Sequence, residues 1–352
     1  MLAAIANTTL LDDVFREDTT TNDLESWIAD LTGHEAALLV MSGTMGNQLS
    51  IRTHLGGPPH SIVADVRSHI MGWEAGGLAS LSGALAIPIP PSNDHHLTLP
   101  DIRTHTILSR DIHACPTRLI SLENTLAGTI LPLSSARDIS AWARAQEPPI
   151  PCHLDGARLW EAVAANAGTL RDYCACFDSV SLCFSKGLGA PVGSMIVGSR
   201  GFIERARHLR KMLGGGTRQA GIITAPARVA VEETFLGGEL ARSHARAREI
   251  AGMWTGKGGV LERECETNMV WLDLGRAGVS RERFVEEGVK AGVKVMGGRL
   301  VVHYQIGEEG VRRLGRVMDA VLGAGGVKVE GGSKEAKVIE KEAERIREVE
   351  AE

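Results

Sequence analysis

Lys186 and Asp155 are the two residues whose types and positions most clearly indicate chemistry. Lys186 follows the apolar run 180–184 and precedes a glycine turn, while Asp155 ends an apolar run that begins at Ile150. A lysine at the end of a buried strand loses hydration, which favours its neutral, nucleophilic amine. Pyridoxal phosphate requires such an amine for its Schiff base and a carboxylate that keeps its pyridine nitrogen protonated. We therefore expect both side chains at one edge of a sheet, holding this cofactor.

Two segments have the composition of anion-binding sites. Ser42, Gly43 and Thr44 follow an apolar run and can present backbone N–H groups and hydroxyls to a phosphate at a helix N-terminus. The glycine-rich run 214–218, preceded by Lys211, is the second candidate. Turn and cap residues, or a helix stop with a solvated basic rim, are the structural alternatives.

Three further side chains could act on a cofactor or substrate. His69 follows an expected strand closely, and an imidazole can stack on a planar ring or exchange protons near neutral pH. Arg158 lies three residues after Asp155, and Arg299 precedes the apolar run 300–302. Either arginine could bind a substrate carboxylate through two parallel hydrogen bonds. Each residue taken alone is more often structural or solvated, so the assignment depends on the set.

Apolar strands alternate with helical patterns along most of the chain, which predicts an α/β fold with a mostly parallel sheet covered on both faces. The expected strands cover residues 36–41, 61–65, 84–89, 118–123, 150–155, 179–185 and 192–198. Expected helices include a segment capped by residues 21–23 and the ranges 134–146 and 157–166.

The pattern predicts two domains and a tail. A large cofactor-binding domain is expected over residues 1–235, and helical sequence from 220 to 258 would lead into a smaller α/β domain over 236–330. That domain would contain strands at 268–274 and 300–304 and helices at 280–291 and 308–322. The charged segment 331–352 is expected to be a solvated helix or a frayed tail.

Composition excludes several classes of protein. The net charge of −5 gives no reason to expect nucleic-acid or anionic-membrane binding. The six cysteines lack paired metal-ligand spacing, so no metal site is expected and buried reduced thiols are the simplest interpretation. No apolar run approaches the ~20 residues of a membrane span, and the first residues lack the basic flank of a signal peptide. These observations predict a cytoplasmic protein.

The motifs and their order resemble the low-specificity L-threonine aldolases, pyridoxal-phosphate enzymes of the aspartate-aminotransferase fold. The resemblance runs from about Asp12 to Leu322. The matching segments are 12–18, 35–48, 68–77, 122–125, 153–158, 185–187, 210–221 and 299–303.

The resemblance implies roles for the candidate residues. Lys186 would form the Schiff base, Asp155 would pair with the pyridine nitrogen, and His69 would stack on the ring. The phosphate would be held by Ser42, Gly43 and Thr44. The amino-acid carboxylate would be bound by Arg158 and Arg299. Lys211 and Arg218 would reach the cofactor of a neighbouring subunit, which implies a homo-oligomer with shared active sites.

Three departures from the family pattern are visible. The sequence starts after the usual Asp-x-Arg-Ser-Asp-Thr motif, so the substrate-binding serine of that motif is not expected here. Phe15 stands where a tyrosine is usual, and Leu126 stands where many members have a histidine that acts near the substrate hydroxyl. With Leu126 in place, His69 would act as the base, directly or through water.

The resemblance implies cleavage of L-threonine or L-allo-threonine, a β-hydroxy-α-amino acid, to glycine and acetaldehyde, and a part in glycine biosynthesis. Two alternatives remain open. One is an amino-acid racemase, for example of alanine, because some fungal relatives racemise and need only Cα proton transfer. The other is an inactive cofactor-binding subunit, which the shortened front of the chain and Leu126 would favour.

Overall fold

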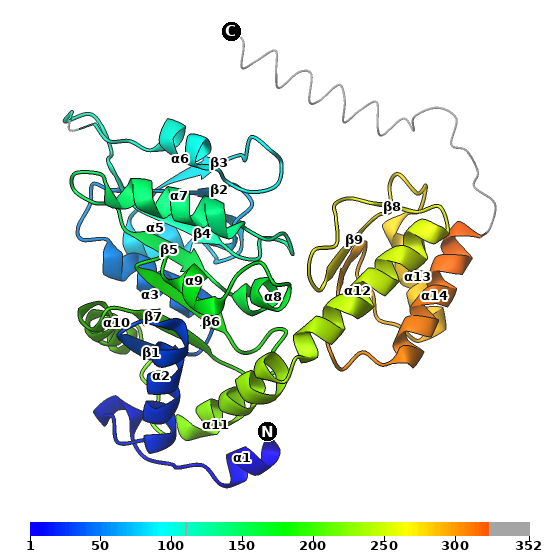
Figure 1. The fold of residues 1–352 in the computed structure, drawn as a ribbon, viewed down its shortest axis with the longest axis horizontal. Helices are drawn as coiled ribbons and strands as arrows, with labels where there is room; N and C mark the ends of the chain where they lie inside the picture. The colour runs from blue at the N-terminus through cyan, green and yellow to red at the C-terminus, as the bar shows by residue number, and fades with distance from the viewer. Residues whose placement is uncertain (110, 324–352) are drawn as a thin grey trace. The chain divides into compact units, whose positions relative to one another are not determined.

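A seven-stranded sheet organises the first part of the chain (Figure 1). The structure is a computed structural model and describes residues 1–109 and 111–323. The strands are β1 (Ala36–Val40), β2 (Ser61–Asp65), β3 (Leu85–Ile89), β4 (Thr117–Glu123), β5 (Cys152–Asp155), β6 (Ser179–Cys183) and β7 (Ser194–Gly198), in the order β1-β7-β6-β5-β4-β2-β3.

The strand directions give the sheet one edge where carboxyl ends gather. Strands β3, β2, β4, β5 and β6 are mutually parallel, and only β7 runs antiparallel to its neighbours β6 and β1. The expected mostly parallel α/β sheet is therefore confirmed. Because parallel strands end at the same edge, residues that follow β4, β5 and β6 come together although they are far apart in sequence.

Both faces of this sheet are covered, as the continuous apolar strands predict. Leu38 and Val40 pack on one face with Leu49 and Ile203, whereas Ala37 belongs to the cluster on the other face. In Figure 1 helices α7 and α9 lie on one side of the sheet, and α3 and α10 lie on the other. Residues alternate between the faces because successive side chains of a strand point in opposite directions.

The helices that precede β6 or pack near the sheet have the following bounds: α1 (Leu2–Ala6), η1 (Asp13–Phe15), α2 (Thr19–Thr32), α3 (Gly43–His54), α4 (His69–Gly72), α5 (Gly77–Ser82), α6 (Leu99–His105), α7 (Leu133–Arg144), α8 (Leu159–Ala164) and α9 (Leu170–Cys174). After β7 come α10 (Arg200–Met212), α11 (Gly221–Val229), η2 (Ala230–Leu236) and α12 (Glu239–Gly256). The stretch 230–236 is a π-helix within the expected helical region.

The chain divides into two compact units. Unit 1 comprises Met1–Arg248, Glu264–Met269 and Val301–Gln305, and unit 2 comprises Glu249–Arg263, Val270–Leu300 and the described residues from Ile306 onward. Unit 1 thus continues past the expected boundary at residue 235, and it also includes two short segments from later in the chain. A second sheet has the order β10-β9-β8, with β8 (Val260–Leu261), β9 (Met269–Asp273) and β10 (Arg299–Val301), followed or flanked by α13 (Arg281–Ala291) and α14 (Glu308–Leu322). The predicted tail 331–352 lies outside the described residues.

Two expected boundaries are corrected. Helix α2 begins at Thr19 because the Asp18 carboxylate accepts a hydrogen bond from the Thr21 amide at 2.9 Å, so Asp18 and not residues 21–23 supplies the cap. The strand expected over 300–304 ends at Val301. There the Val302 amide turns to the carbonyl of Asn268, at 2.8 Å.

The six cysteines are free thiols. Four are buried, whereas Cys115 and Cys265 are half-buried, so the expectation of reduced thiols agrees with the structure and burial is incomplete. None of the helices within the described ranges is long and apolar enough to cross a membrane.

Candidate active site

Lys186 lies in a turn directly after β6, and its side chain is half-buried. The turn is closed by the Gly189 amide, which donates to the Lys186 carbonyl at 2.9 Å. A Cβ at Gly187 would collide with the Glu161 carboxylate, which itself pairs with His244 at 2.7 Å, so only glycine lets the backbone approach this buried pair. The turn that carries Lys186 is therefore packed closely against the buried pair of Glu161 and His244.

Asp155 is the last residue of β5 and is buried. One carboxylate oxygen, Oδ1, accepts from the Ala157 amide at 3.0 Å, and Oδ2 accepts from the Asn47 side chain at 2.7 Å. Since β5 and β6 are parallel neighbours, Asp155 and the Lys186 turn share the carboxyl edge of the sheet. The structure thus brings together the two residues on which the sequence prediction depends.

His69 begins α4 beside the same edge, with a side chain that is 38% exposed. Its Nδ1 is 2.8 Å from Glu74 Oε1, and its backbone amide donates to Glu123 Oε2 at 2.8 Å. The imidazole is therefore partly accessible while its orientation is set by a carboxylate.

Glu123 ends β4 and is in register with Asp155 on β5, so the two carboxylates lie on the same side of the sheet. Burial and the charge of Asp155 raise the pKa of Glu123 from its usual 4.5 to about 8, against the opposing effects of the His69 amide, Lys186 and Arg158. Glu123 thus holds a proton near neutral pH beside the candidate site.

Ser42, Gly43 and Thr44 form the N-terminus of α3, as expected. The Ser42 hydroxyl oxygen accepts from the Met45 amide at 3.1 Å, so this serine caps the helix and keeps its own proton to donate. A Cβ at Gly43 would lie 2.7 Å from Cys183 Sγ. This close approach brings the first-turn amides, which have no acceptor within the helix, to the end of β6, three residues before Lys186.

The basic residues predicted for the site lie in different parts of the chain. Arg158 follows β5, is half-buried, and acts on Glu123 electrostatically. The exposed Lys211 lies near the end of α10, and the exposed Arg218 forms an ion pair with Asp12. Arg299 begins β10 in unit 2, where its guanidinium is 5.7 Å from the Trp271 ring, and its role toward unit 1 stays a prediction.

Sequence reasoning did not assign roles to Glu123, Glu74 and Asn47. Glu123 carried a usable signal, because it ends an apolar strand in the same way as Asp155. Asn47 and Glu74 gave no such signal, because Asn47 bonds Glu74 across 27 residues of sequence and Asp155 across 108.

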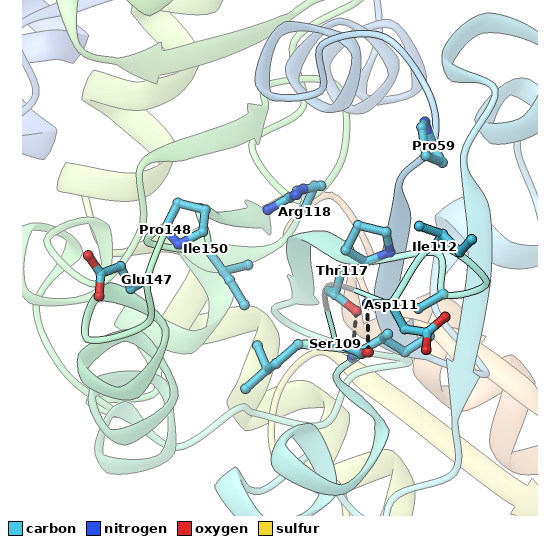
Figure 2. A pocket seen from close by; sticks show the side chains of 13 residues that line it. Pro59, Ser109, Asp111, Ile112, Thr117, Arg118, Glu147, Pro148 and Ile150 are labelled. Carbon is cyan, nitrogen blue, oxygen red and sulfur yellow. Dashed lines mark hydrogen bonds between the residues drawn. The ribbon is translucent and has the colours of Figure 1, made fainter.

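A separate cavity of about 290 Å³ opens at the opposite edge of the sheet (Figure 2). It lies where β4 begins, at Thr117 and Arg118, and where Pro148 and Ile150 lead into β5. None of the described residues that line it is a lysine or a histidine. This cavity is therefore not where the candidate chemistry lies.

Pyridoxal phosphate fits the donors at the carboxyl edge. They comprise an amine on Lys186, a buried carboxylate on Asp155, an accessible imidazole on His69 and a helix N-terminus that Gly43 brings against β6. These are the groups that the cofactor's aldehyde, ring nitrogen, ring face and phosphate require.

Comparison with known proteins supports the cofactor and the class of enzyme. The beta-eliminating lyase family matches residues 1–276. The chain is 60% identical to the aldolase vrtJ of Penicillium aethiopicum over 92% of this chain and 83% of that protein. It is 44% identical to the alanine racemase TOXG of Cochliobolus carbonum, over 93% and 85% of the two chains. It is also 44% identical to the low specificity L-threonine aldolase of Saccharomyces cerevisiae, over 87% and 79%.

Among solved structures, the threonine aldolase of Leishmania major superposes with a TM-score of 0.78 at 20% identity, covering 91% of this chain and 94% of that one. This likeness supports the fold, and the sequence relatives support the chemistry. The chain belongs to the beta-eliminating lyase family, among the relatives of low-specificity threonine aldolases, and is a pyridoxal-phosphate-dependent carbon–carbon lyase.

Proposed function

We propose that the protein cleaves L-threonine or L-allo-threonine to glycine and acetaldehyde. The observation that carries the proposal is the convergence of Lys186, Asp155 and His69 at one sheet edge. The relatives named threonine aldolases support this choice of substrate.

Three residues would hold the reacting part of the cofactor. Pyridoxal phosphate, when bound, supplies an electron sink for the bond that breaks at the substrate Cα. Lys186 Nζ would hold its aldehyde carbon, the Asp155 carboxylate would keep its ring nitrogen protonated, and the His69 ring would stack against it. Ser42, Gly43 and Thr44 would bind its phosphate through the N-terminus of α3.

Substrate binding would depend on two arginines. Arg158, on the turn after β5, and Arg299, at the start of β10, would each bind the amino-acid carboxylate. A planar guanidinium can make two parallel hydrogen bonds to a carboxylate, which fixes orientation as well as charge.

The β-hydroxyl proton would go to His69. Its Nδ1 already bonds the Glu74 carboxylate, so Nε2 is the nitrogen left to accept a proton, directly or through one water. As that proton leaves the oxygen, the Cα–Cβ bond opens and acetaldehyde departs. The same proton would then pass from His69, through water and Lys186 Nζ, to Cα, which completes glycine with no net gain or loss of protons.

The active assembly would be a homo-oligomer with shared sites. Lys211 and Arg218 are both exposed in the single chain, which a side chain that reaches into a partner subunit requires. Mixing Lys186→Ala chains with Arg218→Ala chains should restore activity, because one hybrid site keeps both residues. No recovery, with subunit exchange verified by mass spectrometry, would place both residues in one chain's site.

A racemase is the second candidate, and Leu126 favours it. Leu126 is buried and apolar, and only its backbone pairs, with Thr129. It cannot assist a hydroxyl, whereas racemisation needs only proton transfer at Cα. The relative named alanine racemase supports keeping this alternative.

Product analysis separates the candidates. The purified protein is incubated with threonine, allo-threonine and alanine of both hands, and products are resolved by chiral chromatography. Glycine with acetaldehyde supports the aldolase, and alanine of inverted configuration supports the racemase. Bound cofactor without turnover of any of these substrates would overturn both and indicate an inactive cofactor-binding subunit.

A further inference from the structure

Two carboxylates and an imidazole are crowded at the candidate site. One ligand atom from each of His69, Glu74 and Asp155 lies within 4.8 Å of the other two. Glu74 and Asp155 are both buried. Like charges at this separation repel strongly away from water, so hydrogen-bond donors must stand between them.

Asn47 supplies those donors from the first turns of α3. Its Nδ2 donates to Asp155 Oδ2 at 2.7 Å and to Glu74 Oε1 at 2.8 Å. The same Glu74 oxygen receives His69 Nδ1, and its other oxygen receives Gln48 Nε2 at 2.5 Å. One amide group thus joins the carboxylate expected under the ring nitrogen to the carboxylate that orients the imidazole.

The orientation of the Asn47 amide follows from proton counting. Both Nδ2 hydrogens are used by carboxylates, so Oδ1 must accept, and its partner is His153 Nε2 at 3.2 Å. Burial lowers the pKa of His153 to about 3, so the ring is neutral and carries its single proton on Nε2.

The chain of donors continues away from the site. His153 Nδ1 must accept, and Ser179 Oγ donates to it at 2.8 Å. The Ser179 oxygen in turn accepts from His54 Nε2 at 2.7 Å. His153 and Ser179 are fully buried, so no water competes for these bonds and the direction of every donor is set.

We propose that Asn47 is a positioning residue that sets Asp155 and, through Glu74, His69, with His153 locking its amide. Asparagine suits this place because it offers two donors and one acceptor on a neutral group. Aspartate would add a third buried charge, and leucine, of similar size, would leave both carboxylates without these donors. The inference rests on the proposed roles of Asp155 and His69.

The test uses Asn47→Leu with Gln48→Leu as the matched control, because Gln48 donates to Glu74 and not to Asp155 among the described contacts. The first readout is the pH titration of the visible absorbance of the holoenzyme. The second is the titration of the His69 ring by NMR in the cofactor-free full chain. Melting curves show whether each variant folds. If the leucine variant does not fold, Asn47→Ala takes its place.

Asn47→Leu is expected to move both readouts. Its absorbance midpoint should shift by about one pH unit, and the His69 midpoint should rise because Glu74 loses a donor and attracts a proton more strongly. Gln48→Leu should raise the His69 midpoint alone. A folded Asn47→Leu protein with neither shift, or an equal absorbance shift in Gln48→Leu, would overturn the proposal.

The other charged groups that face this cluster stay constant across these variants. Among the described residues they are Arg158 after β5 and Lys186 after β6, together with the titratable Glu123 at the end of β4. The NMR readout needs neither cofactor nor turnover, so it keeps its meaning even if threonine is not cleaved. Failure of the proposed function and failure of this inference are therefore distinguishable.

Discussion

The two edges of the main sheet differ in what they bring together. At the carboxyl edge, Asp155 and Glu74 are buried and fully engaged with donors from other elements. At the amino edge, the cavity of Figure 2 is lined largely by proline and aliphatic side chains. Ile112, on its rim, is 94% exposed.

The difference follows from the direction of the strands. Strand ends and the N-termini of following helices meet at the carboxyl edge, so backbone N–H groups and side chains from distant segments converge there. The amino edge receives helix C-termini and connecting loops. The convergence of strand ends therefore identifies the candidate site, whereas the cavity at the amino edge offers no comparable set of groups.

The largest expected effect separates the two edges directly. Lys186→Ala should lose the visible absorbance of the bound cofactor and nearly all turnover. The reason is that Lys186 supplies the amine in the turn after β6 that would form the Schiff base. Arg118→Ala, at the opposite edge, should stay within about twofold of wild type, as expected of a surface change. The measurements are absorbance spectra and steady-state rates. Equal losses in both variants would remove the distinction between the edges.

A smaller loss is expected for Asp155→Asn, which keeps the shape of the side chain and removes its charge. Loss of a charge-assisted contact in an occluded site costs at least ~1.5–3 kcal/mol, or roughly ten- to hundredfold in rate. Steady-state kinetics with the purified holoenzyme provide the measurement. Rates within about twofold of wild type would contradict a role at the ring nitrogen.

Leu126→His sharpens the comparison within the carboxyl edge. The turn at Leu126 is held by backbone bonds with Thr129, of 2.9 and 3.0 Å, so it should survive the substitution. A histidine there can assist hydroxyl deprotonation, and threonine cleavage should rise at least about threefold relative to Cα–H exchange. Exchange is followed by deuterium incorporation into glycine or alanine. An unchanged ratio in a folded, cofactor-binding variant would mean that position 126 does not select between the two reactions.

The smallest expected effect concerns stability and pH. The folded chain binds the Glu123 proton more tightly than the unfolded chain, because the pKa rises from 4.5 to about 8 on folding. This contribution is fully present below the unfolded pKa and is lost as pH rises through the folded value. The cofactor-free protein should therefore lose stability toward about pH 8, and Glu123→Gln should reduce that slope.

Melting temperatures between about pH 6.5 and 8 measure this slope, above the range in which the buried His54 and His153 contribute most. Asp155, Arg158 and Lys186 face Glu123 and are unchanged in the variant. An identical slope for wild type and Glu123→Gln would show that Glu123 does not carry a displaced proton.

Local pattern was enough to predict the strands and the residues at their ends. The expected strand 61–65 is observed without change, and Lys186 and Asp155 lie just beyond or at the ends of β6 and β5. Buried parallel strands are continuous apolar runs bounded by polar and glycine residues, so the sequence displays them directly. The same pattern did not reveal that β7 is antiparallel or that residues 264–269 and 301–305 return to unit 1.

Within the site, the sequence by itself determined which side chains could do the chemistry, and the tertiary structure decided how they are held. The reactivity of a lysine, an aspartate or a histidine can be inferred from the residue type and its local sequence context. Asn47 does not, because an asparagine near the start of a helix is ordinary, and its role arises only when Glu74 and Asp155 are placed against it. Hydrogen-bond partners across a fold depend on strand register and helix placement, which are properties of the packed chain and not of any local segment.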